Sequence, residues 1–119
     1  MINTKFYDGF EGESELSLVS GINKLVIWNG YFEMILDSLI ELGIEKKGIV
    51  KEYFYHEGWY DNSPWLISDL PLTIRQLKLV NADHFNSDRT SKEAIKNVLK
   101  ELISFLELNS DQKVYIEYD

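Results

Sequence analysis

Three acidic residues in the N-terminal half of the chain, Glu33, Asp37 and Glu41, stand four positions apart. In a helix this spacing places the three carboxylates in a row on one face. Each like-charged pair at this spacing destabilises a helix by roughly 0.2–0.5 kcal/mol, and Glu41 near the helix C-terminus also opposes the helix dipole. The row is therefore a candidate docking ridge for cationic side chains. The alternative is the solvent-exposed face of a helix in an acidic protein.

A second candidate lies in residues 57–69, where tryptophan and tyrosine stand beside carboxylates in a segment predicted to be a loop. Protein interfaces favour aromatic residues, because they supply a large rigid contact area. The alternative is that Trp59 and Trp65 cover the core. For Trp65, which precedes Leu66 and Ile67, we expect core packing, whereas Trp59 and Tyr60 fit either role. The candidate binding residues of this segment are Glu57, Trp59, Tyr60 and Asp61.

Catalytic chemistry has few candidate residues. The chain has no cysteine, which excludes a thiol nucleophile and a disulfide, and its two histidines are His56 and His84. Four residues after His56 stands Tyr60 and not the second histidine of a zinc protease motif. Near His84, Ser87 and Asp88 supply the residue types of a catalytic triad, but such mixtures are common in polar loops. We expect no catalytic residue and no cofactor.

An acidic stretch near the start of the chain contains two glycines and is expected to be flexible. It lacks the aspartate and glycine spacing of a calcium-binding loop, so we expect no metal site. Its carboxylates belong to Asp8, Glu11, Glu13 and Glu15.

The charge is unevenly distributed along the 119 residues. Twenty acidic and 12 basic residues give a net charge of −8, which argues against nucleic acid or anionic lipid as the main partner. Residues 1–45 hold eight acids and two bases, whereas residues 69–100 hold four acids and six bases. Clustered acids create a directional field, so the distribution predicts an acidic face for a basic protein partner.

The length and the absence of long apolar runs bear on organisation and location. A chain of 119 residues is expected to form a single domain, residues 1–119. No apolar run approaches the roughly 18 residues of a membrane span, and the first residues lack the features of a signal peptide. We expect a cytoplasmic protein with no membrane partner.

Hydrophobic periodicity predicts the elements that position these residues. A helix is predicted over about 31–42, ended by Gly43, and a strand over 49–56, which is rich in β-branched and aromatic residues. A second helix is predicted from Ser68 or Asp69 to about Val80. Residues 13–20 fit a short helix, and residues 24–28 fit either a strand or a helical turn.

The C-terminal part gives the clearest pattern. A third helix is predicted to begin with a capping box of Thr90 and Glu93 and to end near Asn109. On this helix Lys92, Lys96 and Lys100 are expected to face water. Residues 113–118 alternate as a final strand, predicted to pair with residues 49–56. The predicted fold is α+β, with three to four helices packed on a small, mainly antiparallel sheet.

Two segments carry a family resemblance. WNGYFEMILDSL, at 28–39, and EYFYHEGWYDNSPWLISDL, at 52–70, resemble the immunity proteins of bacterial contact-dependent growth inhibition and related polymorphic-toxin systems. The resemblance implies a non-enzymatic protein that binds one cognate toxin domain, a basic nuclease, as a 1:1 complex and covers its active site or substrate path.

The resemblance does not place the interface, so the expected toxin-binding residues follow from the chemistry described above. Two other function classes remain open. One is an acidic regulatory or adaptor module that binds another protein, and the other is a small hydrolase that uses His56 or His84. The expected toxin-binding residues are Glu33, Asp37, Glu41, Glu57, Trp59, Tyr60 and Asp61.

Overall fold

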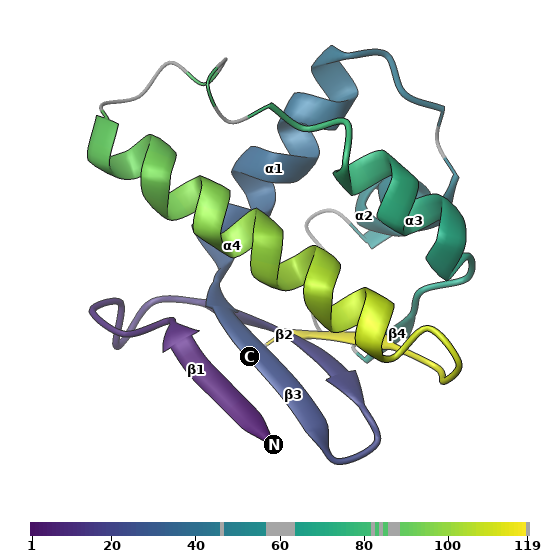
Figure 1. Cartoon of the computed structure of the whole chain (residues 1–119), viewed down its shortest axis with the longest axis horizontal. Coiled ribbons are helices and arrows are strands. Elements are labelled where there is room, and N and C mark those ends of the chain that lie inside the picture. The colour runs from purple at the N-terminus through teal and green to yellow at the C-terminus, as the bar shows by residue number, and fades with distance from the viewer. Residues whose placement is uncertain (46, 57–63, 82, 84, 86–88, 119) are drawn as a thin grey trace.

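The computed structural model describes residues 1–45, 47–56, 64–81, 83, 85 and 89–118. In these residues a five-stranded sheet carries four helices on one face (Figure 1), which confirms the predicted α+β class. The elements in chain order are β1 Ile2–Phe6, β2 Glu15–Ser20, β3 Asn23–Trp28, α1 Asn29–Glu41, α2 Gly48–His56, β4 Trp65–Leu66, α3 Leu70–Leu77, α4 Arg89–Leu108 and β5 Tyr115–Tyr118.

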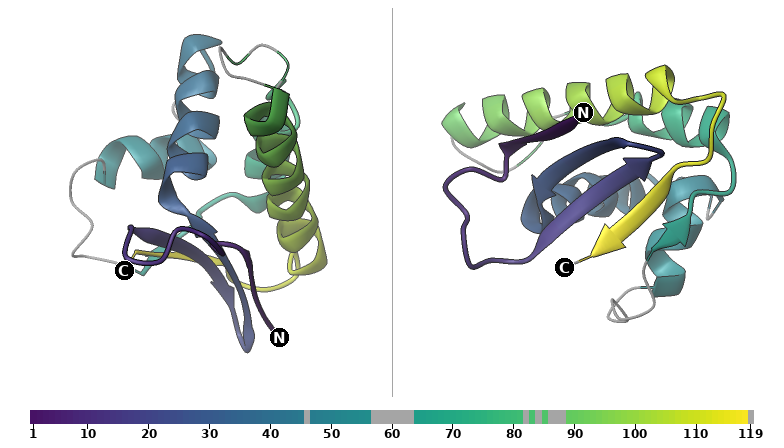
Figure 2. Two further views of the ribbon diagram at one scale, coloured as in Figure 1. Left: turned by 90° about the vertical axis from the view of Figure 1, so that its left-hand side faces the viewer. Right: turned by 90° about the horizontal axis from the view of Figure 1, so that it is seen from below.

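The sheet has the strand order β1-β3-β2-β5-β4. β1 runs parallel to β3, and the other neighbouring strands are antiparallel. Leu16 and Leu18 of β2 lie opposite Ile27 and Leu25 of β3, and these four side chains are buried on the face that the helices cover. Figure 2 shows this layering from the side, with every helix above the same face of the sheet.

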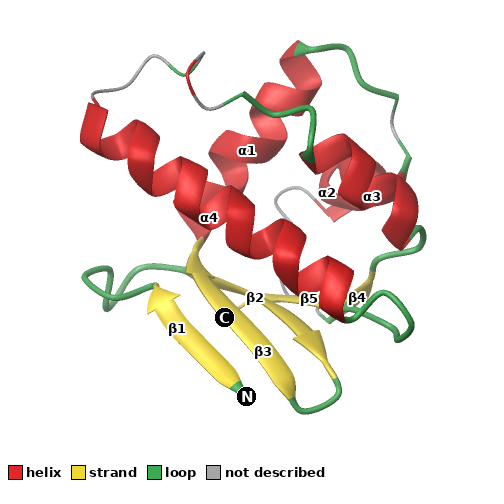
Figure 3. Ribbon diagram, viewed as in Figure 1, coloured by secondary structure: helices red, strands yellow, loops and turns green. Residues whose placement is uncertain are grey.

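Both N-terminal segments that the sequence left undecided are strands. β2 and β3 form a hairpin that turns at Gly21, where φ is +58° and favours glycine. Leu18 also lies opposite Ile116 of β5, so the hairpin occupies the centre of the sheet (Figure 3). The helix suggested for residues 13–20 is wrong, because alternate residues of that stretch are needed to fill the core.

The strand predicted over 49–56 is wrong, because this stretch is the helix α2. Its buried residues Ile49, Val50 and Tyr53 stand at helical spacing and face the core. The backbone N–H of Ile49 donates to Thr73 Oγ1 of α3 at 3.0 Å, which satisfies one of the free donors at the helix start. Tertiary packing thus overrides β propensity, and β5 pairs with β2 and β4 instead.

The two later helices follow the prediction except at their ends. Asp69 caps α3 by accepting a hydrogen bond from the Leu72 N–H at 3.0 Å, but α3 ends at Leu77 and not near Val80. α4 begins at Arg89, so Thr90 is its second residue and the predicted capping box is wrong. The apolar stripe of α4 is buried as predicted, at Ile95, Val98, Leu102 and Leu106.

Two local predictions, for Gly43 and for Trp65, are confirmed. Gly43 follows the end of α1 with φ of +73°, the left-handed conformation expected of a residue that ends a helix. Trp65 is 5% exposed and belongs to the core, as its apolar neighbours predicted.

Candidate protein-binding surface

α1 presents the predicted acidic ridge, defined here as Glu33, Asp37 and Glu41. The opposite face of the helix is anchored, because Phe32, Ile35, Leu36 and Leu39 are each fully buried (0% exposed). Asp37 and Glu41 are therefore exposed, and Glu33 is half-buried.

Two of the three ridge carboxylates are positioned by neutral hydrogen-bond donors. Glu33 accepts a bond of 3.0 Å from the Asn29 side-chain amide, one helical turn earlier. Asp37 accepts a bond of 3.2 Å from the Tyr53 hydroxyl of α2. These donors orient the carboxylates without neutralising them.

A second acidic surface lies at the base of α1, in the connection between β1 and β2. Two successive turns order this connection: the N–H of Phe10 donates to the carbonyl of Tyr7, and the N–H of Glu13 donates to the carbonyl of Phe10. Gly9 and Gly12 adopt φ of +92° and +91°, and the Tyr7 hydroxyl donates to the carbonyl of Glu13. This stretch was expected to be flexible. The structure shows that its turns are held by hydrogen bonds.

The Phe10 ring fixes this connection to the body of the protein. It stacks on the Trp28 indole with ring centroids 4.4 Å apart, and Tyr31 is nearly perpendicular to both rings. The indole also lies against Gly30, where an added Cβ would be 2.5 Å from the ring. Trp28 is thus covered by Phe10 and Gly30.

Sequence reasoning missed this aromatic cluster of Phe10, Trp28 and Tyr31. The available signal was the pair Trp28-Gly30 together with an aromatic residue inside the acidic stretch. The contact between Phe10 and Trp28 depends on the parallel alignment of β1 with β3, which local sequence does not specify.

The carboxylates of the connection act on a neighbouring titratable group. Removal from water raises the pKa of Tyr7, and the carboxylate of Glu15 raises it further, with smaller effects from Glu11 and Glu13. Both removal from water and nearby negative charge favour the neutral hydroxyl over the phenolate, and the part of the pKa shift due to the three glutamates reflects the negative charge of the connection.

The connection and the ridge are continuous. Glu15 lies opposite Trp28 in the β2–β3 ladder, and the N–H of Asn29 donates to the carbonyl of Ser14 at 3.1 Å. Asn29 in turn holds Glu33 at the start of the ridge. Figure 2 shows the β1–β2 connection at the foot of α1, from which the helix rises away from the sheet.

The described acids differ in whether they form an ion pair with another described residue, and Asp69, Glu101 and Asp111 lack one as well as the acids of residues 1–41. Several acids outside this surface pair with a lysine: Glu45 with Lys47, Asp83 and Glu93 with Lys96, Glu107 with Lys78, and Glu117 with Lys24. The acids of residues 1–41 form no ion pair with a lysine or arginine in the described part of the chain. We call these acids of residues 1–41 the unpaired acidic surface: Asp8, Glu11, Glu13, Glu15, Glu33, Asp37 and Glu41.

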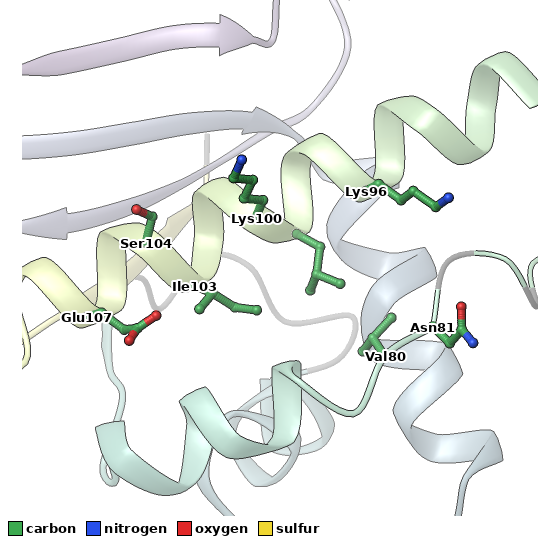
Figure 4. Close-up of a pocket in the computed structure, with 8 residues that line it drawn as sticks. Val80, Asn81, Lys96, Lys100, Ile103, Ser104 and Glu107 are labelled. Carbon is green, nitrogen blue, oxygen red and sulfur yellow. The ribbon is translucent and has the colours of Figure 1, made fainter.

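The side of the molecule formed by α3 and α4 has a groove lined by both acidic and basic side chains. A shallow groove of about 540 Å³ lies there, and in Figure 4 Ile103 and Glu107 of α4 point toward it while Val80 faces them. Lys96 at one end lies 2.8 Å from Asp83, and this hydrogen bond raises the pKa of Lys96. On this side Lys96 pairs with Asp83 and Glu93, and Lys78 pairs with Glu107.

The lysines predicted to face water on α4 do so in part. Lys96 and Lys100 are exposed, whereas Lys92 is half-buried and donates to the carbonyl of Asp83 at 3.2 Å.

Several predicted site residues lie outside the described residues: Glu57, Trp59, Tyr60, Asp61 and His84. Among the described residues no three His, Cys, Asp or Glu side chains gather closely enough to hold a metal ion. Nor does any helix of the described residues have the length and apolar character that crossing a membrane requires.

Comparison with protein-family models, with curated proteins and with solved structures gives no match to this chain. Any statement about function therefore depends on the surface described above and on the resemblance of its sequence segments.

Proposed function

We propose that this chain is an immunity protein that binds and neutralises a cognate toxin domain, a basic nuclease, by covering its active site or substrate path. The observation that carries the proposal is the unpaired acidic surface. Seven carboxylates that form no ion pair with the described residues repel one another in the free protein, and a positively charged partner would relieve this repulsion.

Electrostatics supports this choice of partner. A nuclease presents basic side chains to the phosphates of its substrate, and a row of carboxylates offers the same side chains an alternative anion. Complementary charge can raise association rate constants to about 10⁸–10⁹ M⁻¹s⁻¹ at low salt. The ridge suits this role because Glu33 and Asp37 are oriented by neutral donors and keep their charge.

The rigidity of the β1–β2 connection also supports the proposed binding of a toxin domain. The β1–β2 connection is held by turns and by the Phe10–Trp28 stack, so little conformational entropy remains to be lost on binding. Phe10 and Tyr31 are half-buried and lie beside the carboxylates, where they offer a partner apolar contact that excludes water.

The proposal predicts that a toxin domain is encoded directly upstream of the gene for this chain, and that domain is the partner used in the test. The triple variant Glu33→Lys, Asp37→Lys, Glu41→Lys should fold normally, because these side chains are exposed or half-buried, and should associate at least roughly tenfold more slowly at low salt. Association is measured by stopped flow, folding by circular dichroism and neutralisation by growth on co-expression with the toxin.

A second triple variant separates the effect of where the charges lie from the effect of the net charge. Glu93→Lys, Glu101→Lys, Glu107→Lys on α4 changes the net charge by the same amount on the other side of the molecule, and should slow association much less. Equal effects of the two triple variants would reject the ridge as the contact. Binding without protection of growth would favour the adaptor function instead.

A further inference from the structure

We propose that the pocket at the C-terminal end of α1 is a socket for an arginine side chain of the partner, a proposal that rests on the proposed function and names one of its contacts. The pocket has a volume of about 470 Å³, within the roughly 300–1,000 Å³ typical of binding pockets. It borders the last residue of the acidic ridge. Its lining residues are Ser38, Glu41, Leu42, Leu79, Asn81 and Phe85.

Three of the six residues that line this pocket are large and apolar. Leu42 and Leu79 are 56% and 55% exposed, although both are large aliphatic residues, and Phe85 is half-buried. Exposed apolar residues gathered around a hollow mark a site that gains from being covered. The occupant should therefore have an apolar stem.

The polar groups of the pocket select a cation. Glu41 is exposed and forms no hydrogen bond or ion pair with the described residues, so its carboxylate is available at the pocket mouth. The Ser38 hydroxyl donates its hydrogen to the Ile35 carbonyl at 2.7 Å, which leaves its oxygen as an acceptor. No lysine or arginine is among the described residues that line the pocket.

The C-terminal end of α1 also favours a cation in the pocket. α1 ends at Glu41, and the C-terminal end of a helix carries partial negative charge that attracts cations within its last turn. A carboxylate at this position is unfavourable in the free protein and becomes favourable when a cation occupies the pocket. Glu41 therefore lowers the stability of the free protein and raises its affinity for a cation.

Arginine fits these features better than lysine. Its planar guanidinium can bond a carboxylate through two parallel hydrogen bonds and can stack on an aromatic ring, here that of Phe85, while its methylene stem covers the leucines. Lysine offers only a compact, strongly hydrated charge. Arginine is also enriched among the residues that dominate binding energy at protein interfaces.

The socket can be tested without the toxin. ¹⁵N-labelled protein is titrated with N-acetyl-arginine methylamide and, separately, with the neutral isostere N-acetyl-citrulline methylamide. The arginine probe should shift the amide signals of Ser38, Glu41, Leu42 and Leu79, and the citrulline probe should not. Glu41→Gln should weaken binding of the arginine probe about fivefold or more.

Two further variants serve as controls. Glu13→Gln makes the same charge change in the β1–β2 connection and should leave the affinity for the probe unchanged. Leu79→Ala should weaken binding without unfolding the protein, because this side chain is largely exposed. The socket is overturned if the arginine probe gives no localised shifts, if citrulline binds equally well, or if Glu41→Gln binds as tightly as the wild type.

These outcomes are separable from the fate of the proposed function. If the arginine probe binds and the toxin domain does not, the socket stands and the assignment as an immunity protein fails. If the toxin domain is neutralised but the arginine probe does not bind, the assignment stands and the socket is wrong.

Discussion

The two sides of this molecule use acidic residues in opposite ways. On the α3–α4 side, carboxylates serve the fold: Asp69 caps α3, and Glu107 and Asp83 pair with lysines. On the side formed by α1 and the β1–β2 connection, the carboxylates have no lysine or arginine partner in the described residues. The contrast shows that the net charge of −8 is made up of acids that pair with lysines and acids whose only partners among the described residues are neutral donors.

The largest difference between the two sides is expected when one acidic residue on each side is replaced by alanine. Asp69→Ala should lower the free energy of unfolding by about 1 kcal/mol, because the Leu72 N–H loses its capping acceptor. Asp8→Ala, at an exposed position of the unpaired acidic surface, should change it by less than about 0.5 kcal/mol. Urea unfolding of both variants measures the difference, and equal losses would show that both acids serve the fold.

A smaller effect of opposite sign is expected at the end of α1. Glu41→Lys should raise the free energy of unfolding by roughly 0.5–1 kcal/mol, because it replaces a repulsion with Asp37 by an attraction and complements the helix dipole. Urea unfolding at low and high salt measures this gain, which should shrink as salt screens the charges. An unchanged or lowered stability would mean that Glu41 already has a structural role.

The ridge could be predicted from the sequence because it depends on local periodicity. The positions of Phe32, Ile35 and Leu39 fix which face of α1 is buried, and the remaining face then carries the carboxylates wherever the helix packs. The same reasoning gave the buried stripe of α4 and the cap at Asp69.

Features that depend on distant contacts could not be predicted in this way. The aromatic cluster needs β1 to align with β3, which brings Phe10 against Trp28. Likewise α2 contradicts the β propensity of its residues, because Ile49 and Tyr53 gain more from packing in the core than from a strand conformation. The socket joins the end of α1 to Leu79 and Phe85, which are far apart from it in sequence.

The most direct test of the account is to map the partner's footprint by NMR. ¹⁵N-labelled protein is saturated with the unlabelled toxin domain, and the amide signals that change are assigned to residues. We predict that the changes concentrate at residues 8–15, along Glu33, Asp37 and Glu41 of α1 and at the socket residues Leu79 and Asn81, with few elsewhere on the α3–α4 side. Changes confined to the α3–α4 groove, with the unpaired acidic surface unaffected, would contradict the account.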